Sequence, residues 1–144
     1  MSLPTALRRA CLVIAACLAT SALACVGTTE PCTTASRFAG SWRYSATETS
    51  PATATIAGTL ALKTGSCREF GGSLDAYAVD EQGVTSHIVG SVGGHEVDST
   101  TVQFDALIDG GTRQHLARIR GDSLVGTWAD LFAGGASGAF SAKR

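Results

Sequence analysis

The chain has 144 residues, of which 44% are hydrophobic and only 6% aromatic, and its formal net charge is -1. This length allows one domain of modest size and excludes a multidomain enzyme. With 11 basic against 12 acidic side chains, the chain also lacks the strongly basic surface that nucleic-acid binding requires.

The first 24 residues have the order of a secretory signal peptide. Two arginines precede an uncharged stretch, residues 10–24, and the small residues Ala22 and Ala24 stand at the positions that a signal peptidase inspects. The apolar stretch is shorter than the roughly 20 residues that a transmembrane helix needs. The sequence therefore predicts that residues 1–24 are removed during export, with cleavage before Cys25.

Because Cys25 directly follows the predicted cleavage site, the end of the signal resembles that of a bacterial lipoprotein. This resemblance implies that the Cys25 thiol carries a diacylglycerol group, which would anchor the protein to a membrane of the cell envelope. Cys17, preceded by Ile14-Ala15-Ala16, is the alternative lipidated residue. Cleavage without lipidation, which would release a periplasmic or secreted protein, is the alternative to both.

The number of cysteines favours lipidation of Cys25. Five cysteines are present, and the two within the signal leave Cys25, Cys32 and Cys67, an odd number for an oxidising compartment. With Cys25 acylated, Cys32 and Cys67 are expected to form a disulfide worth roughly 3 to 4 kcal/mol on the chain-entropy view. The alternative pairs Cys25 with Cys32 and leaves Cys67 as a thiol.

Residues 25–36 are rich in Thr and show no apolar periodicity, which predicts a flexible tether. From Arg37 onward the chain is a succession of short segments in which apolar residues alternate with small or polar ones, as in strands with one buried face. We predict eight strands, at residues 37–44, 55–63, 68–79, 84–92, 101–108, 113–120, 123–131 and 137–143.

The predicted connections are short and contain glycine, and they include residues 80–83, 93–95, 109–111, 121–122 and 133–135. Short turns of this kind join antiparallel neighbours. Eight sequentially paired strands expose two edges unless the sheet closes. Residues 37–144 are therefore predicted to form an all-β, eight-stranded antiparallel up-and-down barrel.

A short motif recurs along these strands: a glycine, a small residue and then a large apolar residue. Its glycines are Gly40, Gly58, Gly72, Gly90, Gly126 and Gly138. Period-two alternation puts each glycine on the same face as the large residue two positions on, so the glycines are predicted to face inward. Inward glycines are expected to leave some space inside the barrel.

Gly40-Ser41-Trp42 near the start of the first strand, together with Lys143 and Arg144 at the end of the last, is similar to the calycin group, which includes the lipocalins and avidins. The resemblance implies a barrel in which the tryptophan packs near a basic residue from the end of the last strand. The two tryptophans of this chain are fewer than an avidin biotin pocket contains, so biotin is not the expected ligand.

The sequence contains no nucleophile elbow, Walker loop or dinucleotide motif. His87, His95 and His115 are expected to be scattered exposed residues rather than metal ligands. We therefore expect no catalytic site, cofactor or metal. The inward aromatic residues are expected to pack the core and to line any pocket, and Arg118 joins them if it points inward, where it would suit an anionic ligand; an outward Arg118 is the plainer alternative. The candidate lining residues are Trp42, Tyr44, Phe70, Phe104, Arg118, Trp128 and Phe140.

The predicted function is that of a non-enzymatic module of the bacterial cell envelope, lipid-anchored or otherwise periplasmic or secreted, which binds a small apolar ligand or a protein partner. Inhibition of lysozyme or another hydrolase is the first alternative. It rests on Ser137-Gly138-Ala139-Phe140, which resembles the Ser-Gly-x-x-Tyr loop of bacterial lipoproteins that inhibit lysozyme, with Phe in place of Tyr. An enzyme is the second alternative.

Overall fold

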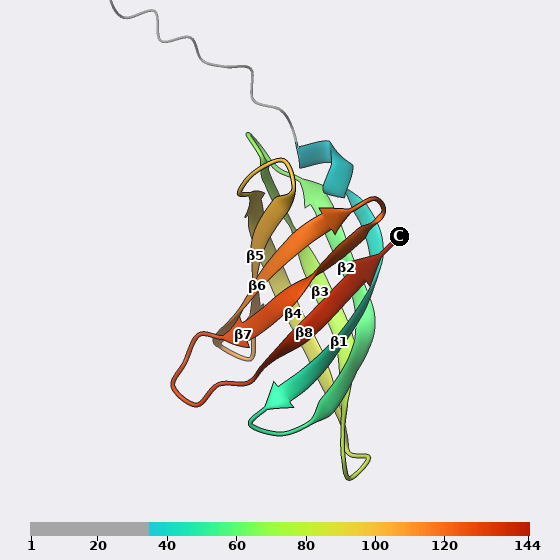
Figure 1. The fold of residues 1–144 in the computed structure, drawn as a ribbon, viewed down its shortest axis with the longest axis vertical. Coiled ribbons are helices and arrows are strands. Elements are labelled where there is room, and N and C mark those ends of the chain that lie inside the picture. Colours follow the sequence, from blue (N-terminus) through green and yellow to red (C-terminus); the bar gives the residue numbers. More distant parts are fainter. Residues whose placement is uncertain (1–34) are drawn as a thin grey trace, which may run out of the picture. The chain divides into compact units, whose positions relative to one another are not determined.

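Alternating apolar and small polar residues run through most of the chain, and each such segment is a strand in the computed structural model, which describes residues 35–144 (Figure 1). A short 3-10 helix, η1 (Ala35–Phe38), precedes the strands. The strands are β1 (Gly40–Ser50), β2 (Ala54–Thr64), β3 (Glu69–Asp80), β4 (Thr85–Glu96), β5 (Thr101–Ile108), β6 (Gly111–Arg120), β7 (Ser123–Asp130) and β8 (Ser137–Lys143).

The predicted signal peptide, with Cys17 and Cys25, and the tether up to residue 34, with Cys32, lie outside the described residues. Cleavage, lipidation and the pairing of Cys32 with Cys67 therefore stay predictions.

Each strand pairs with the next one in antiparallel fashion, and β8 returns to pair with β1. Arg43 lies opposite Lys143 and Ala46 opposite Phe140 in this closing pair. Closure removes both edges of the sheet, which would otherwise expose unpaired backbone groups. The predicted eight-stranded antiparallel up-and-down barrel is confirmed.

Three predicted boundaries are wrong. Ala35 and Ser36, assigned to the tether, belong to η1, as do the first residues assigned to the first strand. The predicted turn at residues 93–95 is part of β4, which continues to Glu96, so His95 lies on a strand. Gly93 and Gly94 fit within this strand because they pair with β5 in regular register, opposite Asp105 and Phe104.

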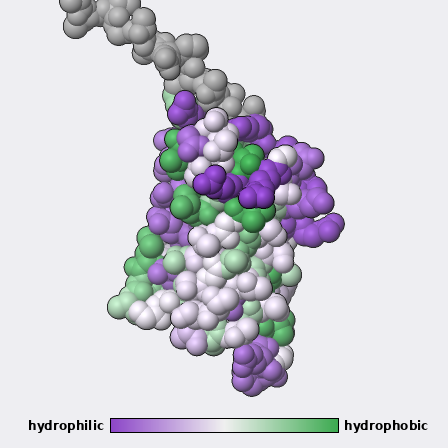
Figure 2. Space-filling view, in the orientation of Figure 1, coloured by the Kyte–Doolittle hydropathy of each residue, from purple (hydrophilic) through white to green (hydrophobic). Residues whose placement is uncertain are grey.

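The inward residues of the strands form one apolar core, which includes six of the seven candidate lining residues: Trp42, Tyr44, Phe70, Phe104, Trp128 and Phe140. The outward face carries mostly short polar side chains. Figure 2 shows this as a pale middle region over the strands, with strongly hydrophilic residues near the η1 end and at the tip of the β3–β4 hairpin.

The inward glycines mark places where neighbouring strands approach closely, and they do not leave open space. A Cβ atom on Gly126 would lie 1.9 Å from the carbonyl oxygen of Leu116, and one on Gly138 would lie 1.7 Å from that of Thr47. The prediction that these glycines leave interior space is therefore wrong. Gly40 also differs from the prediction, since it is exposed and has a φ of 130°.

One end of the barrel is closed by η1. Phe38 is only 1% exposed, and its carbonyl oxygen accepts a hydrogen bond of 2.9 Å from Trp42 Nε1. The Arg144 guanidinium lies 4.4 Å from the centre of a Trp42 ring, as the calycin resemblance implies. Arg37 forms an ion pair with Glu96 at 2.9 Å, which ties η1 to the end of β4.

No helix within residues 35–144 is long and apolar enough to cross a membrane.

Candidate functional site

The end of the barrel opposite η1 is where β5, β6 and β7 come together with the β7–β8 loop (Figure 1). A hollow of about 230 Å³ lies there, and it is lined by Ile108, Asp109, Gly111, Arg113, Asp130 and Phe132. Four of these residues belong to the inward rows of the strands, and two come from the loops. The hollow is therefore part of the barrel mouth. We call it the mouth hollow.

A buried ion pair forms the wall of the mouth hollow. Arg113 Nε donates to Asp130 Oδ1 at 2.7 Å, and Arg113 Nη2 donates to Asp130 Oδ2 at 3.2 Å. The two side chains are each only 12% exposed, so water screens their attraction weakly. Asp130 Oδ2 also accepts a hydrogen bond from the backbone of Ala136, which connects the pair to the β7–β8 loop.

The Arg113 guanidinium lies on the face of Trp128, 3.9 Å from the centre of the ring. A guanidinium held over an indole face is attracted by the ring quadrupole, and the attraction is stronger where water is excluded. Trp128 is only 2% exposed and does not line the hollow. Arg113 therefore separates the hollow from the indole beneath it.

A polar group lies deeper in the barrel, at His115 on β6. Its side chain is fully buried, and the Tyr44 hydroxyl lies 3.0 Å from its Nε2. Phe104 stacks on the imidazole at 4.3 Å, and Phe140 contacts the imidazole edge-to-face at 4.9 Å. The prediction that His115 is exposed is wrong, because its row on β6 faces the core.

Burial controls the protonation of this group. It lowers the pKa of His115 to about 3, and the nearby positive charge of Arg113 lowers it further in the same direction. Burial also raises the pKa of Tyr44 well above its usual value, with a smaller opposing effect of Arg113. At neutral pH the pair is therefore an uncharged phenol beside an uncharged imidazole.

Two buried nitrogen atoms of this region have no hydrogen-bond partner among the described residues: His115 Nδ1 and Trp128 Nε1. His115 and Trp128 are register partners on adjacent strands, and both side chains point into the barrel. Buried polar groups of folded proteins are nearly always paired, so two unpaired groups side by side require an explanation.

The predicted lining residues lie at different depths. Trp42 and Phe70 belong to the closed end, where Phe70 contacts Phe38 at 5.1 Å. Tyr44, Phe104 and Phe140 surround His115. Arg118 is exposed on the outer face, so its inward placement is wrong and its plainer alternative holds.

The sequence analysis missed the Arg113–Asp130 pair, although the sequence contains the signal for it. The predicted turn at residues 121–122 is the real one, and it joins β6 directly to β7. Such a turn places Arg113, eight residues before Gly121, opposite Asp130, eight residues after Asp122. The same register places His115 opposite Trp128.

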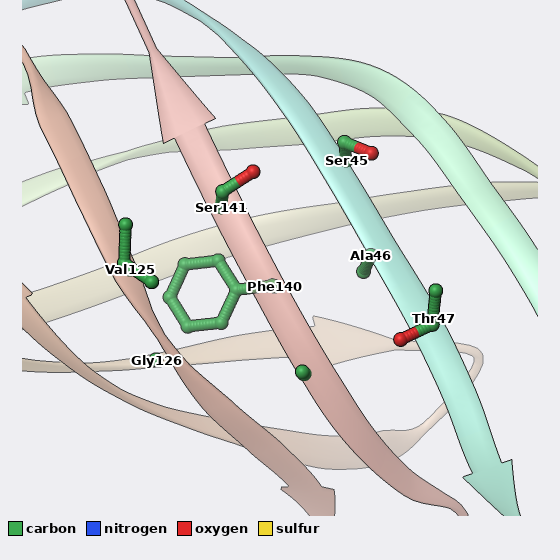
Figure 3. Close-up of a pocket in the computed structure, with 8 residues that line it drawn as sticks. Ser45, Ala46, Thr47, Val125, Gly126, Phe140 and Ser141 are labelled. Atoms are coloured by element: carbon green, nitrogen blue, oxygen red, sulfur yellow. The ribbon is translucent and has the colours of Figure 1, made fainter.

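A second hollow, of about 260 Å³, lies on the outer surface over β7, β8 and β1 (Figure 3). Its labelled residues are Ser45, Ala46, Thr47, Val125, Gly126, Phe140 and Ser141. The side chains that reach it are short, and it holds no charged group. It therefore has few groups that could select a ligand.

The segment compared with a lysozyme-inhibitor loop has a different structure. Ser137–Phe140 forms the start of β8, and the Phe140 side chain is only 3% exposed. It is therefore a buried strand segment and does not project as a loop. No cluster of three His, Cys, Asp or Glu side chains within the described part of the chain is arranged to hold a metal ion.

Comparison with known proteins gives a fold only. No protein-family model matches the chain, and no curated protein is similar to it in sequence. A solved structure described as EF1p2_mFAP2b bound to DFHBI is similar in fold, with a TM-score of 0.60 and 13% sequence identity. The match covers 74% of this chain and 92% of that one. The chain thus has a calycin-like barrel fold.

Proposed function

We propose that this protein is a non-enzymatic barrel that binds a small, largely apolar ligand in the mouth hollow. The observation that carries this proposal is the hollow itself, about 230 Å³ in volume and lined by inward residues of three strands. Small-molecule sites combine apolar walls with a few fixed polar groups. Ile108 and Phe132 supply the apolar walls here, and the Arg113–Asp130 pair supplies the fixed polar group.

Two features support a small and weakly charged ligand. The opposite charges of Arg113 and Asp130 cancel within the wall, so the site holds no excess charge that would attract a strongly ionic ligand. The structural neighbour, a barrel of the same fold, is described as bound to DFHBI, a small ligand. That neighbour supports the idea that a barrel of this shape has room for a small molecule.

The proposal includes the location. Lipidation at Cys25 and export to the cell envelope would place the barrel beside a membrane, on a tether of about a dozen residues. A protein partner is the second candidate for the mouth, favoured by Leu131 and Phe132 on the β7–β8 loop, which are 57% and 59% exposed.

A binding screen with two matched variants tests the ligand proposal. The full chain would be screened against small ring compounds by the rise in its unfolding temperature. Gly111→Leu fills the hollow, because a Cβ on Gly111 points toward the Phe132 ring at 3.7 Å. Gly93→Leu is the control, since a Cβ on Gly93 meets no atom within 4 Å.

A compound at 100 times its Kd is expected to stabilise the native protein and the Gly93→Leu variant by about 2.7 kcal/mol. Gly111→Leu should lose this stabilisation. The proposal is refuted if no compound in the screen stabilises the native protein, or if Gly111→Leu still binds as well as the native chain.

A further inference from the structure

The unpaired nitrogens beneath the mouth hollow indicate which chemical group the ligand presents. Trp128 Nε1 carries a hydrogen and can only donate. It is buried with no acceptor in reach. The other tryptophan is a direct comparison, because Trp42 Nε1 donates to the Phe38 carbonyl at 2.9 Å.

His115 Nδ1 is also best described as a donor. The hydrogen bond between Tyr44 and His115 Nε2 has two possible directions. If Nε2–H donates, the Tyr44 hydroxyl proton is left without an acceptor and Nδ1 is left without a donor, which gives two unpaired groups. If the hydroxyl donates, only Nδ1–H remains unpaired. The second arrangement leaves fewer buried groups unpaired and is therefore favoured.

The inner wall thus presents two N–H groups, on register partners His115 and Trp128, and lacks an acceptor for either. Each unpaired buried donor costs about 1 to 3 kcal/mol. An incoming acceptor would recover part of this cost. A neutral acceptor fits better than an anion, because the Asp130 carboxylate lies beside the entrance and burying a further charge is expensive.

We propose that the ligand of the mouth hollow is a flat ring that bears a neutral carbonyl oxygen, and that this oxygen accepts hydrogen bonds from Trp128 Nε1–H and His115 Nδ1–H. This inference rests on the proposed function. The Arg113 guanidinium, which covers Trp128 at 3.9 Å, moves aside or shares the ring face when the ligand enters. The aromatic side chains of Phe104 and Phe140 around His115 suit a flat ring.

The test uses a matched pair of probes and the two indole N–H signals of the chain. 1-Indanone and indane have the same fused-ring skeleton and differ in the carbonyl oxygen. Each would be titrated into the 15N-labelled full chain while a 15N–1H correlation spectrum is recorded. The two tryptophans give two indole signals, which a Trp42→Phe variant assigns.

The expected result is that 1-indanone moves the Trp128 indole proton downfield, leaves the Trp42 signal in place, and binds about tenfold more tightly than indane. Trp128→Phe keeps an aromatic ring and removes the donor, so it should reduce this preference. Trp42→Phe should retain it. If Trp128→Phe does not fold, the comparison of the two probes still decides.

Two other results overturn the inference in different ways. If both probes bind equally and the Trp128 indole proton does not move downfield, the hollow binds ligands without using these donors, and the proposed function survives. If neither probe changes the signals of residues around the mouth hollow, ligand binding at this site fails together with the inference.

Discussion

Substitution of Gly126 by alanine tests how closely the strands of this barrel pack. The added Cβ would lie 1.9 Å from the Leu116 carbonyl oxygen and 2.7 Å from the Ala117 Cα atom. Ordinary van der Waals contact begins near 3.4 Å, so β6 and β7 must separate locally by about 1.5 Å (3.4 − 1.9). Both clashing atoms belong to the backbone, and no side-chain rotation relieves them.

The expected loss in free energy of unfolding is about 3 kcal/mol. Overpacking a core costs roughly 1 to 3 kcal/mol, and stretching the β6–β7 backbone hydrogen bonds adds about 1 kcal/mol for each bond weakened. Against this, replacing a strand glycine by alanine gains roughly 0.5 to 1 kcal/mol from reduced chain entropy. With a urea m value of about 1 to 3 kcal/mol per molar, the unfolding midpoint should fall by roughly 1 to 3 M.

Gly93→Ala is the matched control. Gly93 also lies within a strand, but a Cβ there meets no atom within 4 Å, so this variant should equal or slightly exceed the native stability. Urea unfolding followed by tryptophan fluorescence measures both variants. Equal midpoints for Gly126→Ala and Gly93→Ala would show that the strands do not approach at Gly126 as described.

Three further predictions concern protonation, the ion pair and lipidation. Below pH 6.5 the unfolded chain binds a proton at His115 that the folded chain does not bind until about pH 3, so stability should fall with decreasing pH in this window by up to about 1.4 kcal/mol per pH unit; a His115→Gln variant with an unchanged pH slope in urea titrations would contradict this. Arg113→Met leaves the Asp130 carboxylate buried and unpaired and should cost about 3 kcal/mol, most of which Arg113→Met/Asp130→Asn should recover in the same assay; no recovery would mean that packing, not charge, stabilises the pair. The intact mass of the protein from its envelope should include a diacylglycerol that Cys25→Ser removes, and an unmodified mature mass would rule out the lipid anchor.

The architecture could be predicted from sequence because the period-two pattern and the short turns both specify antiparallel neighbours. The turn at residues 121–122 was predicted correctly, since Gly121 adopts a φ of 57° that other residues rarely reach. The turn at residues 93–95 was not, because a pair of glycines within a strand has the same composition as a turn. The real turn after β4 contains Asp98, which accepts hydrogen bonds from the Thr100 backbone and hydroxyl.

The site was harder to predict because it depends on register as well as pattern. Arg113 was grouped by composition with Arg118, although the two residues lie on opposite faces of β6. His115 alternates with apolar residues, which indicates a buried row, but its polar type led to the opposite expectation. Counting outward from the turn at residues 121–122 would have paired Arg113 with Asp130 and corrected both errors.

The two tryptophans show how the two ends of the barrel differ. At the closed end, Trp42 donates to the Phe38 carbonyl and Arg144 lies on its ring, so the polar groups there are satisfied within the protein. At the open end, Trp128 also carries a guanidinium on its ring, but its N–H has no acceptor. A barrel that needed only stability would gain from satisfying both. Since the unpaired donors lie only on the side of the mouth hollow, the acceptor they lack is best explained as one that arrives from outside the chain.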